Sequence, residues 1–165
     1  MTYDPSIHHR KSIRLKEYDY AESGMYFFTV CCHDKKALLG HISEGEIELN
    51  RFGEIVHEVW LDLPKHYAQI KLDEFVVMPN HIHGILVINP PAGESGAKKH
   101  TLSEIIRALK TFSARQINAL RSLAGVPVWQ RNYYEHIIRD ESSYTTIAEY
   151  IQTNPMQWEK DDYHV

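Results

Sequence analysis

Cysteine and long apolar runs are both scarce in this chain. The only two cysteines among its 165 residues, Cys31 and Cys32, are adjacent. They therefore cannot close a long loop, and they lack the ligand spacing of a zinc site. No stretch approaches the roughly 18 uncharged apolar residues that suggest a membrane span, and residues 1–11 lack the apolar core of a secretion signal. We expect reduced cysteines, a cytoplasmic location and no membrane partner.

Glycine and proline, with 8 and 7 residues, are too few for a disordered or fibrous chain. Hydrophobic residues make up 43% and charged residues 24%, which is close to average globular composition. A chain of this length can bury one sizeable core but is short for two domains. We predict a single domain over residues 1–165, in which residues 1–20 form an extended basic N-terminal segment.

Positive charge is also in deficit, because 18 Lys and Arg stand against 22 Asp and Glu, for a formal charge of −4. A nucleic-acid-binding protein usually needs a positive surface, so this balance at first argues against that class. The basic residues are unevenly distributed, however: residues 98–139 carry a net +6 and the rest of the chain −10. This stretch, which includes Arg107 and Lys110, fits either a local phosphate-binding face or an ordinary solvated helix surface.

Hydrophobic periodicity and turn residues divide the chain into strands and helices. Strands are predicted at 24–33 and 129–140, and two more lie on either side of a Pro-Asn turn within 71–88. A strand near 46–49 is predicted to be the second strand of the first hairpin. Helices are predicted over 50–67, from Thr101 onward and over 140–154, after a Pro/Gly/Ser loop at 89–100. The order ββαββαβα predicts an α+β fold with a mainly antiparallel sheet.

His81-Ile82-His83 is the sharpest local motif. Strand alternation points both imidazoles to one face and Ile82 to the other, so two metal ligands share a side. A divalent ion would accept this pair with a carboxylate, amide or water completing its shell. The simpler interpretation is two surface or hydrogen-bonded histidines in a chain that has 11 of them.

Tyr150 and Asn154 form a second motif, because a spacing of four places the phenol and the carboxamide one helical turn apart on the same face. A tyrosine with an ordinary pKa near 10 needs help to act as a nucleophile, and a nearby cation would supply it. The alternative is a tyrosine at the edge of the core followed by a helix-ending asparagine.

The segment 129–139 mixes aromatic residues with Arg131, His136 and Arg139. Stacking surfaces beside cations suit a single nucleic-acid strand. Ordinary strand packing with charged edges explains the same composition.

Four segments carry a resemblance to a known family: GMYFFTV, FVVMPNHIHGILV, VWQRNYYEHIIRDE and IAEYIQTNP. Their order and separation are similar to those of the HUH single-tyrosine (IS200-like) transposases, especially the REP-associated branch. The resemblance covers most of the chain. It departs after Pro155, where Met156-Gln157-Trp158 replaces an expected apolar-Lys-small pattern, and loss of that lysine would alter DNA contacts.

The resemblance implies a ferredoxin-like antiparallel sheet of the HUH endonuclease type with helices packed on it. His81 and His83 match the metal-ligating histidines, Tyr150 matches the nucleophile, and Asn154 stands where relatives supply a third, amide ligand. The implied cofactor is Mg²⁺ or Mn²⁺, and histidine ligands favour the latter.

The implied activity is metal-dependent cutting and joining of single-stranded DNA at hairpin or REP-like inverted repeats, through a 5′-phosphotyrosine intermediate. Arg107, Lys110, Arg131, His136 and Arg139 are the expected DNA contacts. The resemblance also allows a homodimer and implies a bacterial, nucleoid-associated protein when it is bound to DNA.

Two other functions compete with this one. A domesticated relative could bind DNA repeats without catalysis, although the four site residues are intact. A metal-dependent hydrolase could use water instead of tyrosine, but no Asp or Glu accompanies the His pair in the sequence as an obvious general base.

Overall fold

The computed structural model describes residues 24–89 and 100–165. Its main sheet has four strands in the order β4-β5-β1-β6, and all neighbouring strands are antiparallel. The strands are β1 (Gly24–Cys31), β4 (Ile70–Val77), β5 (His81–Ile88) and β6 (Tyr134–Ile138). Within these described ranges three α-helices accompany them, namely α1 (Arg51–His66), α2 (Leu102–Leu120) and α3 (Glu141–Thr153). The predicted α+β, ferredoxin-like architecture is confirmed.

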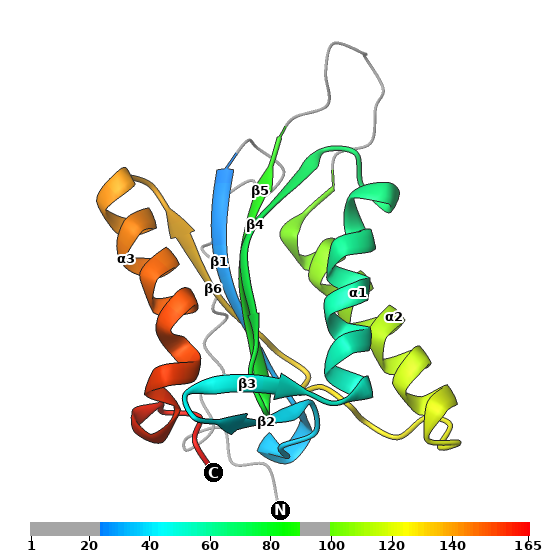
Figure 1. Cartoon of the computed structure of the whole chain (residues 1–165). Coiled ribbons are helices and arrows are strands. Elements are labelled where there is room, and N and C mark those ends of the chain that lie inside the picture. The colour runs from blue at the N-terminus through cyan, green and yellow to red at the C-terminus, as the bar shows by residue number, and fades with distance from the viewer. Residues whose placement is uncertain (1–23, 90–99) are drawn as a thin grey trace, which may run out of the picture.

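The helices lie on both faces of the sheet, with α1 and α2 on one face and α3 on the other (Figure 1). The larger core lies between the sheet and the helix pair, where Phe28, Ile82 and Trp60 are buried. A smaller core under α3 is built on Phe27 and Ile151. Because neighbouring strand residues alternate between these two cores, both faces of β1 and β5 are apolar.

Side chains that accept backbone N–H groups mark the start of each helix. Asn50 caps α1 by accepting from the Gly53 amide, and Asp140 caps α3 by accepting from Ser143. Thr101 and Glu104 form the predicted capping box of α2. These caps satisfy amides that a helix leaves free at its first turn, which is why the predicted helix starts agree with the structure within a residue.

The first predicted hairpin is wrong in its partner. Residues 46–49 do form a strand, β3 (Glu46–Leu49), but it pairs with β2 (Gly40–Ser43) in a separate two-stranded sheet and not with β1. The turn between them consists of Glu44 and Gly45, both with positive φ (52° and 77°). Positive φ at both turn residues matches the twist of the strands in a two-residue hairpin, so the Glu44-Gly45 dipeptide marks the turn that joins β2 to β3.

One further predicted strand is shorter in the structure, and two predicted segments lie outside the described residues. The strand predicted at 129–140 is shorter, because Trp129 makes only an isolated bridge to Cys32 before β6 begins at Tyr134. Cys31 and Cys32 are both free thiols. The N-terminal segment 1–20 and most of the loop 89–100 lie outside the described residues. Within the described ranges, no helix is both long and apolar enough to cross a membrane.

Gly84 provides a test of the strand register that positions the site. It lies opposite Phe28 in the β1–β5 pair, and a methyl group at residue 84 would lie 2.6 Å from Phe28 Cζ. Gly84→Ala is therefore expected to lower the free energy of unfolding by about 1–3 kcal/mol, as measured by urea denaturation. Adding Phe28→Leu should recover part of this loss in a double-mutant cycle. Full stability of the Gly84→Ala protein would contradict the register.

Candidate metal and tyrosine site

The His81–His83 pair lies on the face of β5 that points toward α3. Both rings are buried, with relative exposures of 0% and 1%, while Ile82 enters the larger core on the opposite face. The two Nε2 atoms approach to 3.1 Å. Strand alternation therefore brings two imidazole nitrogens to one point, as the sequence predicted, but in a buried place and not on an open surface.

Asn80 fixes the orientation and the tautomer of His81. The Asn80 amide nitrogen donates to the carbonyls of Tyr163 (2.7 Å) and Lys35 (3.3 Å), so the amide oxygen faces His81 Nδ1 at 2.8 Å. That oxygen can only accept, so His81 Nδ1 carries the proton and Nε2 keeps its lone pair. Metal-ligating histidines are commonly held by such an outer hydrogen bond.

His83 connects the strand to the tyrosine. Its Nδ1 is 2.7 Å from Thr29 Oγ1, on the neighbouring strand, and its Nε2 is 3.4 Å from the hydroxyl of Tyr150. The Tyr150 ring contacts the rings of His83 and Phe27 and is 39% exposed. Asn154, one turn further along, is buried with 2% exposure. Helical spacing thus brings both predicted residues to the His pair.

Asp161 joins the site from the C-terminal segment that follows η2 (Asn154–Lys160). Its Oδ2 lies 4.0 Å from His81 Nε2 and accepts from Asn154 Nδ2 at 2.8 Å, while its Oδ1 accepts from the Tyr163 amide at 2.8 Å. The potential ligand atoms of His81, His83 and Asp161 all lie within 4.8 Å of one another. The sequence showed no Asp or Glu beside the His pair as an obvious general base, and the structure corrects this by placing Asp161 there.

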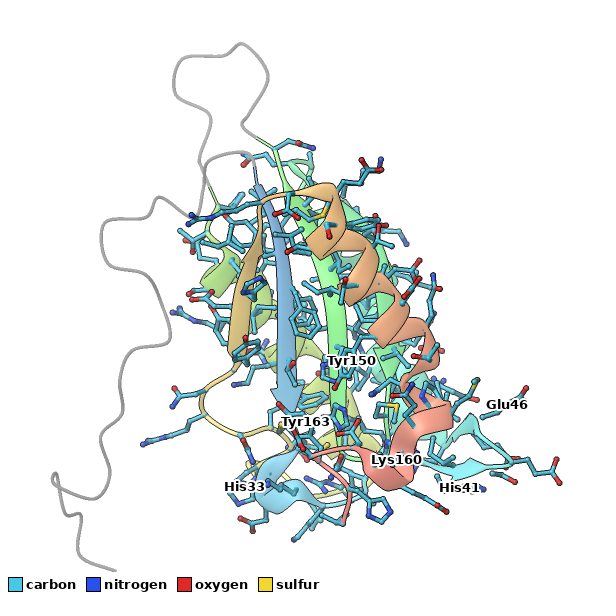
Figure 2. The ribbon with its side chains drawn as sticks, turned by 90° about the vertical axis from the view of Figure 1, so that its left-hand side faces the viewer. His33, His41, Glu46, Tyr150, Lys160 and Tyr163 are labelled. Carbon is cyan, nitrogen blue, oxygen red and sulfur yellow. The ribbon has the colours of Figure 1, made fainter. Side chains whose placement is uncertain are left out.

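The C-terminal segment also covers the pair with aromatic rings. The Tyr163 ring lies 4.5 Å from that of His81, and the Trp158 ring stacks on it at 6.0 Å. Figure 2 shows Tyr163 close to Tyr150 near the end of β1. Three residues of the site were not predicted from the sequence: Asn80, Asp161 and Tyr163. Of these, only Asn80 carried a signal, because it directly precedes the His-Ile-His motif.

The donor set fits a divalent cation. Two neutral imidazoles, one carboxylate and an amide oxygen are ligands that Mn²⁺ and related transition ions accept. Asn154 Oδ1 is buried and has no hydrogen-bond partner within 24–89 and 100–165, so its lone pairs are available for a cation. The Asp161 side chain is 1% exposed and no Lys or Arg pairs with it in the described chain. A buried anion of this kind needs a positive partner.

Burial sets the protonation of the site. It lowers the pKa of His81 to about 4, although the Asp161 carboxylate acts in the opposite direction. Burial, together with the neighbouring His81, also lowers the pKa of His83 well below its usual value. Both imidazoles are therefore neutral and able to donate lone pairs. Burial, together with Asp161, raises the pKa of Tyr150 to about 12, so its phenol needs a positive charge nearby to ionise.

The predicted DNA contacts lie at different places on the molecule. Arg107 is exposed on α2, on the sheet face opposite the His pair. The Lys110 ammonium donates to the carbonyls of Gln130 (2.5 Å) and Arg131 (3.1 Å), and its burial lowers its pKa. Three of the predicted contacts are exposed on β6 or beside it, namely Arg131, His136 and Arg139. Lys110 thus holds the segment that leads into this strand.

Known proteins similar to this chain include members of one transposase family. The sequence profile of the family described as "Transposase IS200 like" matches residues 25–154. An uncharacterized protein of Haemophilus influenzae is 43% identical over 99% of this chain and 97% of its own length. A second protein of that organism, provisionally named a REP-associated tyrosine transposase, is 26% identical over 84% of this chain and 74% of its own length.

Two solved structures share the fold. A REP-associated tyrosine transposase bound to a REP hairpin superposes with a TM-score of 0.60 at 22% identity, covering 87% of this chain and 74% of that chain. A provisionally assigned transposase from Deinococcus radiodurans superposes with a TM-score of 0.52 at 18% identity, covering 84% and 95% of the respective chains.

The buried histidines predict how the metal-free protein responds to acid. Because the pKa of His81 falls from 6.5 to about 4 on folding, the unfolded chain takes up this proton first as the pH falls. Stability should be complete above pH ~6.5 and decline toward pH ~4, with a loss of about 2 kcal/mol by pH ~5 from His81 alone. Urea midpoints measured in EDTA between pH ~7.5 and pH ~5 test this.

The exposed His41 supplies the control for that titration. In the part of the chain that the structure describes, His41 forms an ion pair with Glu48 alone, at the surface, and both side chains are more than 60% exposed. His41→Gln should therefore leave the pH dependence unchanged. A metal-free protein that is equally stable at both ends of this range would show that the His pair is not held neutral by burial.

Proposed function

Since the chain belongs to the IS200-like transposase family, we propose that it cuts and joins single-stranded DNA with Tyr150 as the nucleophile. One observation carries the proposal. The Tyr150 hydroxyl lies 3.4 Å from His83 Nε2, at the point where the two imidazoles and the Asp161 carboxylate converge. Tyr150 is also the partly exposed member of this group, so a DNA phosphate can approach its oxygen.

The proposed cofactor is Mn²⁺ or Mg²⁺, held by His81, His83 and Asp161 with the amide oxygen of Asn154. When bound, such an ion supplies positive charge that polarises a phosphodiester and favours ionisation of nearby groups. The protein's part is to hold the ligands. Asn80 and Thr29 bind the outer nitrogens of the two rings, and Asn154 donates to Asp161, so each ligand has one fixed orientation.

The proposed reaction transfers the DNA strand to the protein and back. Tyr150 Oη loses its proton and bonds to the scissile phosphorus, while the bond from phosphorus to the 3′-oxygen breaks and that oxygen gains a proton. The products are a 5′-phosphotyrosine and a free 3′-hydroxyl. Joining reverses these steps with another 3′-hydroxyl, and the covalent bond conserves the energy of the phosphodiester. No nucleotide is consumed, and the sequence has no GxxxxGK[ST] phosphate loop.

The proposed substrate is single-stranded DNA beside a hairpin or inverted repeat. Support comes from the hairpin bound to the structurally similar REP-associated transposase. Arg131, His136 and Arg139 would contact the strand along β6, where they are exposed. Arg107 and Lys110 would contribute to a second basic surface on α2, and Lys110 would also hold the carbonyls of residues 130 and 131.

Hydrolysis is the second candidate function, and Asp161 is the observation that favours it. A carboxylate beside a metal-binding His pair can orient and deprotonate a water molecule. In that case Tyr150 would bind the substrate without forming a bond to it. The two reactions share the same ligands and differ in which oxygen attacks the phosphorus.

Replacement of Asp161 tests the metal site. Asp161→Asn keeps the shape of the side chain but removes its negative charge, so Mn²⁺ affinity should fall. Changes to the hydrogen bonds that orient metal ligands lower metal affinity by about 10- to 100-fold, so loss of a ligand should lower Mn²⁺ affinity by at least about 10-fold. Isothermal titration with Mn²⁺ gives the affinity directly. The matched control is Asp162→Asn, because Asp162 is the exposed neighbour of Asp161, and this variant should bind Mn²⁺ as the parent protein does. Equal affinities for the two variants would remove Asp161 from the site.

Replacement of Tyr150 separates strand transfer from hydrolysis. Tyr150→Phe keeps the ring contacts with Phe27 and His83, so the protein should fold and bind DNA. It should lose both DNA cleavage and the denaturation-resistant protein–DNA band on gels. Tyr144→Phe is the control, because the Tyr144 hydroxyl donates to Asp73 and not to the site. Cleavage by Tyr150→Phe, or an adduct mapped to Tyr133, Tyr134 or Tyr144, would refute the nucleophile assignment.

A further inference from the structure

A hollow of about 260 Å³ adjoins the His pair along β1 and the start of β6. Its lining includes Thr29 and Cys31 of β1, Tyr163 of the C-terminal segment, and Gln130, Asn132 and Tyr134 of the chain that enters β6. Thr29 is shared with the site, because its hydroxyl contacts His83. Figure 2 shows α3 in front of β4 and β5, with β6 to one side of it. The hollow therefore lies next to the reacting centre.

The lining of the hollow is uncharged. None of its residues is a Lys, Arg, Asp or Glu, although acidic and basic residues are frequent elsewhere. A phosphate would find no cation there. A neutral group with hydrogen-bonding edges suits it better, since Gln130 and Asn132 each offer an amide donor and an amide acceptor. Within the described residues neither side-chain amide has a hydrogen-bond partner, because the hydrogen bonds of Gln130 use its main-chain atoms.

The aromatic walls favour a flat ring. Tyr134 is 48% exposed, and its ring meets Phe27 edge-on at 6.1 Å, which leaves a face of the phenol uncovered by that neighbour. Drug-sized ligands occupy pockets of about 300–1,000 Å³, so this smaller hollow suits a single planar group. Exposed bases of single strands are recognised by stacking on such rings and by hydrogen bonds to their edges.

We propose that this hollow binds one unpaired nucleobase of the DNA strand, from a nucleotide flanking the scissile phosphate. The proposal rests on the function proposed above. The amides of Gln130 and Asn132 bind the edge of the base, and Tyr134 stacks on its face. Because Thr29 connects the hollow to His83, base recognition is coupled in space to the position of the phosphate at Tyr150. The hollow is thus a specificity-determining subsite.

Binding without cleavage tests the subsite. A single-stranded oligonucleotide selected from a random pool with the Tyr150→Phe protein supplies the probe, and copies with one abasic residue at successive positions are titrated by fluorescence anisotropy. One abasic position should lower affinity by roughly 10-fold, the scale of one stacked base. In the same background, Gln130→Ala, Asn132→Ala and Tyr134→Ala should bind the intact probe more weakly. They should also lose sensitivity to that one position.

Gln152→Ala is the matched control, because Gln152 is exposed on α3 and pairs with Glu74 outside the hollow. It should discriminate between intact and abasic probes as the parent does. Retained discrimination in the Gln130, Asn132 and Tyr134 variants would overturn the subsite. The covalent adduct of the protein with Tyr150 intact is a separate readout. Its absence alongside base discrimination lost in those variants would refute strand transfer and leave the subsite standing.

Discussion

The rest of the site depends on the convergence of two imidazole nitrogens at 3.1 Å in a place that water does not reach. Buried polar groups are costly unless they are satisfied, and each ring is held from behind by a specific partner. His81 has Asn80, which is itself tied to the C-terminal segment, and His83 has Thr29 on the neighbouring strand. The β1–β5 register, the helix and the tail therefore all act on the same pair.

The parts of this site that follow from local periodicity were predictable. Alternation along a strand put His81 and His83 on one side, and helical spacing put Tyr150 and Asn154 on another element's inner face. Capping residues likewise predicted the starts of the helices, because the physical cause lies within a few residues of the chain. Local periodicity does not show that β5 and α3 meet, and this long-range contact was predicted from the resemblance to the transposase family.

Contacts made by irregular segments could not be derived in the same way. Asp161 follows a 3₁₀ stretch, η2. Neither the strand period of 2 residues nor the α-helical period of 3.6 residues applies there, so periodicity cannot predict which side chain points inward. Its place beside His81 depends on where the chain turns after Trp158. The segment before β6 fails for a related reason: its aromatic residues resemble a strand, but only Trp129 pairs with β1's end, and the next residues line a hollow.

Asp161 changes the balance between the two candidate reactions without deciding it by its presence alone. A carboxylate near Tyr150 raises the pKa of the phenol, adding to the effect of burial, so by itself it opposes tyrosine attack. Asp161, together with the two imidazoles, would hold a divalent cation there, and its positive charge would oppose that effect by favouring ionisation of the phenol. In a water-based hydrolase the Tyr150 phenol, which lies 3.4 Å from His83 Nε2, would serve only to bind the substrate. The arrangement of anion, imidazoles and phenol around one point is therefore the physical basis of the strand transfer proposed for Tyr150.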